Sequence, residues 1–248
     1  MYRERPSRLP GAVVWQSDPA TGVRVLPDGC MDLLWNGTDL LVAGPDTTAY
    51  VAGPTPYTGL RFAPGTLPAL LRVPAHELRD RRVPLADLWP TSRVRRMADV
   101  VARAAATRGP GQAADLADGD SGSAWPTGTP SALGQAGAAL DNLVLDLAGS
   151  PDPFVTQLVR RLRAGEPVAA IAADAEVSER QLHRRSLALF GYGPKVLARI
   201  LRLQRALALA RRGTPYATVA VTAGYADQPH LARDVKSLTG VPLTTLLP

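Results

Sequence analysis

The sequence predicts an α+β protein with a β-rich N-terminal half and an all-α C-terminal half. Short apolar runs separated by Pro and Gly occupy residues 1–90, a pattern typical of short strands joined by turns. A helix-turn-helix pattern occurs twice between residues 166 and 240, with a long basic helical stretch between the two copies. The chain has 248 residues, 46% of them hydrophobic, so it is long enough for two domains with separate cores.

The first half predicts a small β-sandwich or barrel with short helices. The apolar runs are residues 12–15, 23–26, 31–35 and 40–43. Turn residues separate them: Pro-Asp-Gly at residues 27–29, and Asn36-Gly37, which predicts a hairpin because apolar residues flank it. Residues 59–65 belong to a segment that is similar to a known domain, named below, and that similarity implies a further strand, a Pro-Gly turn and a short helix.

The pattern changes to helical periodicity from Arg93 to Ala106, where apolar residues recur at helical spacing. Residues 108–135 have no periodicity and are rich in Gly, Pro and Ser, which predicts a flexible connector. A helix is expected at 138–147, and Asp152-Pro153 predicts the cap and first position of another that ends at Gly165. The expected domains are 1–107, a connector at 108–137, and 138–248.

The repeat in the C-terminal half aligns residues 168–185 with residues 217–236. Ser178 and Asp227 are side chains that cap helix N-termini, and each is followed four residues later by Leu and six residues later by Arg. The pair Leu182 and Arg184 therefore recurs as Leu231 and Arg233. Two capped helices, each preceded by a short apolar segment of small residues, predict two helix-turn-helix motifs.

These residues resemble the DNA-binding domain of the AraC/XylS family of bacterial transcription regulators. The resemblance covers roughly the last hundred residues and rests on SERQLHRR (178–185), FGYGPK (190–195), LARILRLQRALALA (197–210), GYADQPHLAR (224–233) and LTGVP (238–242). Residues 59–89 resemble the N-terminal domain of a large uncharacterised subgroup of these regulators, and many regulators of this family carry a cupin-like sensor domain. The resemblance implies a sequence-specific, DNA-binding transcription regulator.

The sequence departs from the family pattern at three positions. Glu176 stands where the first motif usually has Gly, so a left-handed backbone there would be strained. The second motif keeps Gly224. Ser186 and Val235 replace aromatic residues that often follow the Arg of each recognition helix, which weakens the expected core packing more than the DNA assignment.

The resemblance places the second helix of each motif in the DNA major groove. With Leu182 and Leu231 facing the core, the helical period turns the basic and amide side chains near the helix starts outward. Arg can pair with guanine in a bidentate manner, Gln suits adenine, and Lys binds phosphate. The predicted DNA-binding residues are Arg180, His183, Arg184, Arg185, Lys195, Gln228, His230, Arg233 and Lys236. The alternative for each of them is a solvated or capping side chain, and Asp234 is expected to pair with a neighbouring Arg or Lys.

The stretch 195–212 predicts one long helix with a broad apolar surface and several basic residues. Such a helix spans roughly 25 Å at ~1.5 Å per residue. With the flanking turns included, the two recognition helices can lie about one DNA turn, ~34 Å, apart. One chain is therefore expected to read two successive major grooves.

Charge separates the two halves of the chain. Residues 151–248 contain 14 Lys and Arg against 7 Asp and Glu, whereas residues 1–150 contain 14 against 15. The basic excess predicts double-stranded DNA, a promoter or operator, as the partner of the C-terminal half. RNA polymerase, a small-molecule effector and a second copy of the chain are further candidate partners. No membrane partner is expected, and the absence of an apolar leader with only one cysteine, Cys30, predicts a cytoplasmic protein.

Two alternatives to transcription regulation are a cupin-like metal enzyme and an architectural DNA-binding protein. A cupin-like metal enzyme needs several His and carboxylate ligands, but His76 is the only His outside the DNA-binding half. We therefore expect no catalytic residue, metal or cofactor. The other alternative is an architectural DNA-binding protein without a ligand.

Some residues of the first half leave two roles open. Asp28 and Asp32 are expected in a hairpin and its turn, with a pocket as the alternative. Trp15, Trp35 and Trp89 are expected in the core, with an apolar ligand pocket as the alternative. Cys30 is expected to be a buried structural thiol, because apolar residues surround it.

Overall fold

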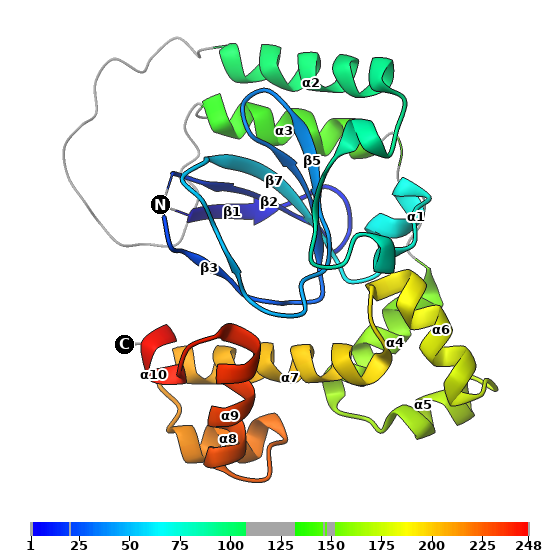
Figure 1. The fold of residues 1–248 in the computed structure, drawn as a ribbon, viewed down its shortest axis with the longest axis vertical. Coiled ribbons are helices and arrows are strands. Elements are labelled where there is room, and N and C mark those ends of the chain that lie inside the picture. Colours follow the sequence, from blue (N-terminus) through cyan, green and yellow to red (C-terminus); the bar gives the residue numbers. More distant parts are fainter. Residues whose placement is uncertain (1, 20, 108–131, 146, 148–151, 248) are drawn as a thin grey trace.

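The computed structural model describes residues 2–19, 21–107, 132–145, 147 and 152–247. It confirms the α+β class: a β-sheet covered by helices lies on one side, and a helical region that ends at the C-terminus lies on the other (Figure 1). The long helix α7, Pro194–Arg211, runs along the boundary between the two parts.

The N-terminal part is built on a six-stranded antiparallel sheet in the order β1-β2-β7-β4-β5-β8. A separate two-stranded ribbon pairs β3 with β6. The strands are β1 Tyr2–Pro6, β2 Val13–Ser17, β3 Arg24–Val25, β4 Met31–Trp35, β5 Leu40–Ala43, β6 Tyr50–Val51, β7 Tyr57–Phe62 and β8 Arg82–Pro84. The four apolar runs and the segment at 59–65 are thus confirmed as strands, whereas β1, β6 and β8 were not predicted.

The predicted hairpin joins β4 to β5 through Asn36. Its side-chain Oδ1 accepts hydrogen bonds from the backbone N–H groups of Thr38 (3.0 Å) and Asp39 (2.7 Å). Gly37 has a φ of 106°, a conformation that suits glycine. The turn fixes the register in which Trp35 faces Leu40.

Side chains alternate between the two faces of the sheet, as the strand period of two requires. On one face Val14, Leu33 and Leu60 are buried in the core. On the opposite face Trp15 and Asp32 line a cavity, together with Leu34, Tyr57 and Arg61, which point to the same side of the sheet. The sheet therefore separates an apolar core from a polar and aromatic cavity.

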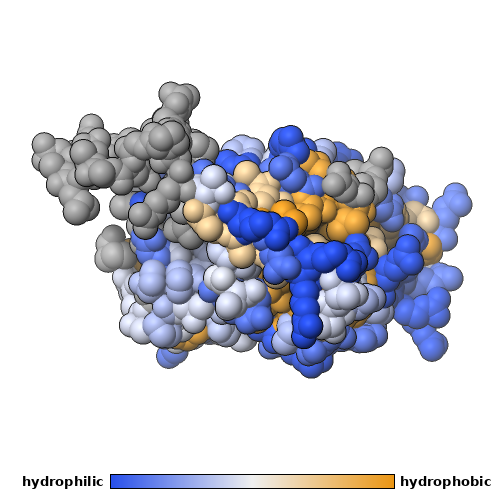
Figure 2. Space-filling model, turned by 90° about the horizontal axis from the view of Figure 1, so that it is seen from above, coloured by the Kyte–Doolittle hydropathy of each residue, from blue (hydrophilic) through white to orange (hydrophobic). Residues whose placement is uncertain are grey.

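Two long helices cover the core face: α2 Thr91–Ala106, as predicted, and α3 Ala132–Leu145. Shorter helical segments connect the sheet to them: α1 Leu67–Leu71, η1 Ala75–Glu77 and η2 Leu85–Asp87. On the face of the molecule seen from above, apolar surface lies between strongly hydrophilic side chains (Figure 2). Val100 of α2, which is 38% exposed, is the exposed large hydrophobic residue of this helix.

The placement of α3 differs from our expectation. The helix predicted at 138–147 was assigned to the DNA-binding half, but α3 buries Ala136, Leu140 and Val144 in the core of the sheet domain. Gly137 allows this approach, because a Cβ there would lie 2.6 Å from a methyl group of Val14. Asp141 accepts a hydrogen bond from Arg5 near the N-terminus, at 3.3 Å. Of the expected connector, 108–131 lies outside the described residues and 132–137 belongs to α3.

The C-terminal part contains α4 Pro153–Ala164, α5 Val168–Asp174, α6 Glu179–Phe190, α7, α8 Tyr216–Ala223, α9 Gln228–Thr239 and α10 Leu243–Leu246. The predicted start and end of α4 are confirmed: the Asp152 side chain accepts from the N–H of Phe154, and Gly165 ends the helix in the left-handed conformation. One end of α7 packs in a core with α4–α6, and its other end in a core with α8–α10.

Several hydrogen bonds join the two parts of the molecule. Gln204 of α7 donates to the backbone oxygen of Pro27 (2.7 Å), and the N–H of Ala49 donates to the backbone oxygen of Leu238 in α9 (2.8 Å). A Cβ on Gly65 would lie 2.7 Å from Phe190 at the end of α6. The N-terminal domain thus contacts the connecting helix and the C-terminal ends of both predicted recognition helices.

Candidate nucleic-acid interface and interdomain cavity

The first helix-turn-helix motif consists of α5 and α6. Ser178 and Gln181 form the predicted capping box at the start of α6, in which each side chain binds the other's backbone N–H. Leu182 and Ser186 are buried against the rest of the domain. The turn before the cap has the predicted strain, because Glu176 has a φ of 52°.

The second motif consists of α8 and α9 and keeps glycine in its turn. Gly224 has a φ of 85° and ends α8. Asp227 caps α9 by accepting from the N–H of His230 (2.7 Å), and Pro229 lies in the first turn, where its missing N–H is no loss. Leu231 is buried, so the alignment of the two motifs on their caps is confirmed.

Most of the predicted DNA-binding side chains are exposed to solvent. The exposed ones are Arg180, His183, Arg184, Arg185, Lys195, Gln228, Arg233 and Lys236. His230 is half-buried, with its ring edge-on to Tyr225 at 5.2 Å between ring centroids. The guanidinium of Arg185 stacks on Phe154 at 3.7 Å, so this side chain already has a partner within the protein. Exposed basic side chains, among them Arg180 and Arg184 of α6 and Arg233 of α9, therefore lie in the first two turns of both helices.

Three arginines of α7 face the protein instead of extending its basic surface. Arg199 and Arg202 form ion pairs with Asp234 of α9, at 2.5 and 3.5 Å. Arg205 donates to the backbone oxygens of Arg163 (2.9 Å) and Ala223. The expected pairing of Asp234 with a neighbouring Arg is thus confirmed.

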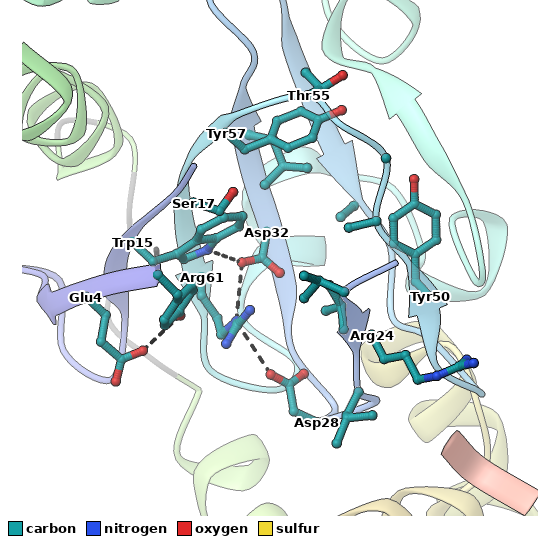
Figure 3. A pocket seen from close by; sticks show the side chains of 18 of the residues that line it. Glu4, Trp15, Ser17, Arg24, Asp28, Asp32, Tyr50, Thr55, Tyr57 and Arg61 are labelled. Carbon is teal, nitrogen blue, oxygen red and sulfur yellow. Dashed lines mark hydrogen bonds and ion pairs between the residues drawn. The ribbon is translucent and has the colours of Figure 1, made fainter. Parts of the chain in front are cut away.

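A cavity of about 650 Å³ lies between the second face of the sheet, the β3–β6 ribbon and the helical domain (Figure 3). The sheet contributes aromatic and charged side chains to it, among them Trp15, Asp32 and Arg61. Gln204 and Arg211 of α7 and Leu246 of α10 complete its wall. This volume falls in the range of small-molecule sites, about 300–1,000 Å³.

One charged cluster dominates the cavity. The Nε atom of Arg61 lies 3.3 Å from Oδ1 of Asp32 and 3.5 Å from Oδ2 of Asp28. Trp15 also donates from Nε1 to Oδ1 of Asp32, at 2.6 Å. Burial raises the pKa of Asp32 to about 6, although the charge of Arg61 opposes this rise. Burial disfavours the charged form of Arg61, but Asp32 and Asp28 outweigh it and raise the pKa of the guanidinium.

Asp28 and Asp32 each have both of the expected roles, one in the hairpin or its turn and one at the cavity. Asp28 binds the N–H of Cys30 (2.8 Å) in the predicted turn and also pairs with Arg61 at the cavity. Asp32, expected in the hairpin, lies in strand β4 and faces the cavity. Cys30 is half-buried, whereas full burial was expected. Desolvation of its thiol still raises the pKa well above its usual value, which favours the expected structural role.

The tryptophans divide between the two alternatives: Trp35 is in the core and Trp89 packs against it, as expected, whereas Trp15 lines the cavity. Sequence reasoning missed Arg61 as a site residue, together with Tyr2, Tyr50 and Tyr57. The alternation of Tyr57 and Arg61 on one strand face was the available signal.

The part of the chain that the structure describes contains no group of three or more His, Cys, Asp and Glu side chains able to hold a metal ion. None of the helices in the described ranges combines the length and the apolarity needed to cross a bilayer.

Comparison with known protein families gives one match in each half of the chain. Residues 171–247 match a family described as a helix-turn-helix domain, and residues 12–84 match a domain of unknown function, DUF6597. A search of curated proteins finds no match.

Among solved structures, the chain is similar to ToxT from Vibrio cholerae. The 1.65 Å structure of ToxT has 8% sequence identity and a TM-score of 0.46, over 99% of this chain and 97% of that chain. An apo variant of ToxT from strain SCE256 has 11% identity and a TM-score of 0.48, over 99% and 98%. ToxT with a bound unsaturated fatty acid has 10% identity and a TM-score of 0.44, over 100% and 97%.

The family match at residues 171–247, together with two capped helix-turn-helix motifs on one connecting helix, defines a DNA-binding transcription regulator. Its helix-turn-helix domain is of the AraC type, as the motifs in its sequence implied. The DUF6597 match covers residues 12–84 and so includes most of the segment at 59–89.

Proposed function

We propose that α6 and α9 read two adjacent major-groove segments of one operator, and that an effector in the interdomain cavity modulates this binding. The observation that carries the proposal is the pair of exposed basic turns, one at the start of each recognition helix, on a single polypeptide. Arg184 and Arg233 occupy matching positions six residues after the two caps, Ser178 and Asp227. Arg at such a position can pair with guanine, so each motif has a base-reading side chain of its own.

The cavity supports the effector part of the proposal, because its wall is shared by both domains. Gln204 and Arg211 belong to the helix that separates the two recognition helices, so an occupant would contact that helix directly. Gln204 also binds Pro27, the residue before Asp28 of the charged cluster. An occupant that shifts this turn would act on the connecting helix, which is the element that sets the spacing of the two motifs.

The domain boundary that we propose lies after α3 and before α4, between residues 147 and 152, in place of residue 138. The buried side chains of α3 belong to the core of the sheet, and those of α4 belong to the core around α6. Contact with RNA polymerase and homodimer formation stay predictions.

The experiment is selection of bound fragments from a random DNA pool by the full-length protein, followed by footprinting of the selected site. We expect two protected patches about 10 base pairs apart on one face of the duplex. Arg184→Ala should remove one patch and Arg233→Ala the other. Protection of a single patch that neither variant changes would mean that only one motif reads DNA. Binding of all fragments alike would favour the architectural alternative.

A further inference from the structure

The interdomain cavity is lined by half-buried carboxylates and by aromatic rings. Tyr2, Trp15, Tyr50 and Tyr57 line the cavity with Asp28 and Asp32, and Figure 3 shows Asp32 among the labelled rings. Trp15 is held there by its hydrogen bond to Asp32 and by Gly59 on the neighbouring strand. A Cβ on Gly59 would lie 2.4 Å from the indole ring, so only glycine leaves room for Trp15 at this position.

The cluster of Asp28, Asp32 and Arg61 in this cavity contains more negative than positive groups. Both Asp28 and Asp32 pair with one cation, Arg61, through its single Nε atom, which leaves one net negative charge when both carboxyl groups are ionised. The two contacts of Asp32 fall on Oδ1, and no described residue donates a hydrogen bond to its Oδ2 atom. The Asp32 side chain is 14% exposed and lines the cavity, so a ligand there can donate a hydrogen bond to this oxygen.

The other arginines of the cavity do not reverse this charge. Arg82 forms a bidentate pair with Asp46, at 2.5 and 2.7 Å, and stacks on Tyr50 at 3.9 Å. Arg24 and Arg211 lie at the rim and are exposed, so solvent and salt screen them. Arg61 lies over the ring of Trp15 at 5.8 Å, so this ring already has a cation, as Tyr50 has. An anionic ligand would have to approach two carboxylates, whereas a cation would meet both them and the rings of Tyr2 and Tyr57.

We propose that the cavity binds a small organic cation, an amine or quaternary ammonium compound with an apolar body. The ammonium group lies against Oδ2 of Asp32 and the surrounding rings, and the apolar body extends along the wall toward α7. The assignment rests on the proposed role of the cavity as the effector site. The small organic cation is then the effector that this cavity recognises.

Three probes with one aromatic body and different head groups test the assignment: phenethylamine, phenylpropionate and phenethyl alcohol. Calorimetry on the full-length protein should give at least about tenfold tighter binding of the amine than of the other two, since one charge-assisted contact is worth about that factor. Asp32→Asn should remove this preference. Asp39→Asn, which changes an exposed carboxylate in the hairpin turn, is the matched control and should leave it intact.

Asp28→Asn is the second variant, because its amide oxygen can still accept from the N–H of Cys30. We expect it to weaken amine binding several-fold without loss of folding. Tighter binding of phenylpropionate than of phenethylamine, or amine binding that Asp32→Asn and Asp28→Asn leave unchanged, would overturn the assignment.

A parallel measurement of operator binding separates the two proposals. If the amine binds in an Asp32-dependent way but leaves operator affinity unchanged, the ligand class stands and the proposed modulation fails. If operator affinity responds to phenylpropionate alone, the modulation stands and the ligand class is wrong.

Discussion

Asp234 of the second recognition helix lies 2.5 Å from Arg199 of the connecting helix, measured from Oδ1 to Nε. Asp234 is buried, with 7% of its surface exposed, and it also accepts from the hydroxyl of Tyr225 at 3.0 Å. The residue therefore fixes the orientation of α9 on α7, although it follows directly after the predicted base-reading Arg233. A carboxylate next to the predicted DNA-binding surface is tolerated because its charge is neutralised within the protein.

Asp234→Ala should destabilise the C-terminal core. The substitution leaves Arg199 and Arg202 without their anion, which we expect to lower the free energy of unfolding by about 2 kcal/mol, since Arg199 is partly exposed. Urea denaturation measures this change, with Asp39→Ala as an exposed control. A loss no larger than that of the control would show that the ion pair has no stabilising role.

Arg184→Ala and Arg233→Ala should each weaken binding to the selected operator by about 1–3 kcal/mol, if the lost contact is a bidentate pair with a base. Lys195→Ala should weaken selected and random DNA alike, because a phosphate contact carries no sequence information. Titrations with both DNAs at one salt concentration measure the difference. An equal effect of all three variants on random DNA would assign the arginines to phosphates.

Glu176→Gly should stabilise the first motif by about 1 kcal/mol, because glycine adopts the left-handed backbone at 176 without steric cost. The matched change in the second motif is Gly224→Ala, which should destabilise the protein by about 1 kcal/mol for the same reason. The two changes therefore test the left-handed turn conformation with opposite expected effects on stability. Thermal and urea unfolding of both variants and the parent measure whether the free energy of unfolding rises or falls.

The carboxyl group of Asp32 should make stability depend on pH between about 4 and 6. Its pKa is about 6 in the folded protein and about 3.9 in an unfolded chain, so the unfolded state releases the proton first as the pH rises. The contribution of Asp32 is therefore most favourable below pH ~4 and is lost as the pH rises to ~6.

Asp32→Asn removes this titration, whereas its charged neighbours Arg61, Asp28 and Arg82 remain. Between pH ~4.5 and ~7, the free energy of unfolding of the parent should fall relative to that of the variant by on the order of 2 kcal/mol. Urea denaturation at the two pH values measures this difference. A constant difference would mean that Asp32 keeps an ordinary pKa.

Local features of the C-terminal half were predictable because each depends on residues within a few positions. Ser178, Asp227 and Asp152 cap helices through their own backbone neighbours, and the strain at Glu176 follows from the turn that separates the two helices of a motif. The DNA-binding candidates followed from the helical period, since a residue's distance from the buried Leu decides which side it occupies.

The sequence by itself determined the fold class, the two motifs and the positions of most strands along the chain, because periodicity and capping act over short distances along the chain. Only the tertiary structure decided that α3 belongs to the sheet, that Arg199 binds Asp234, and that Asp28, Asp32 and Arg61 converge in a cavity. Side chains 29 to 35 residues apart make these ion pairs. Their partners are set by how strands pair and helices pack, which no local pattern records.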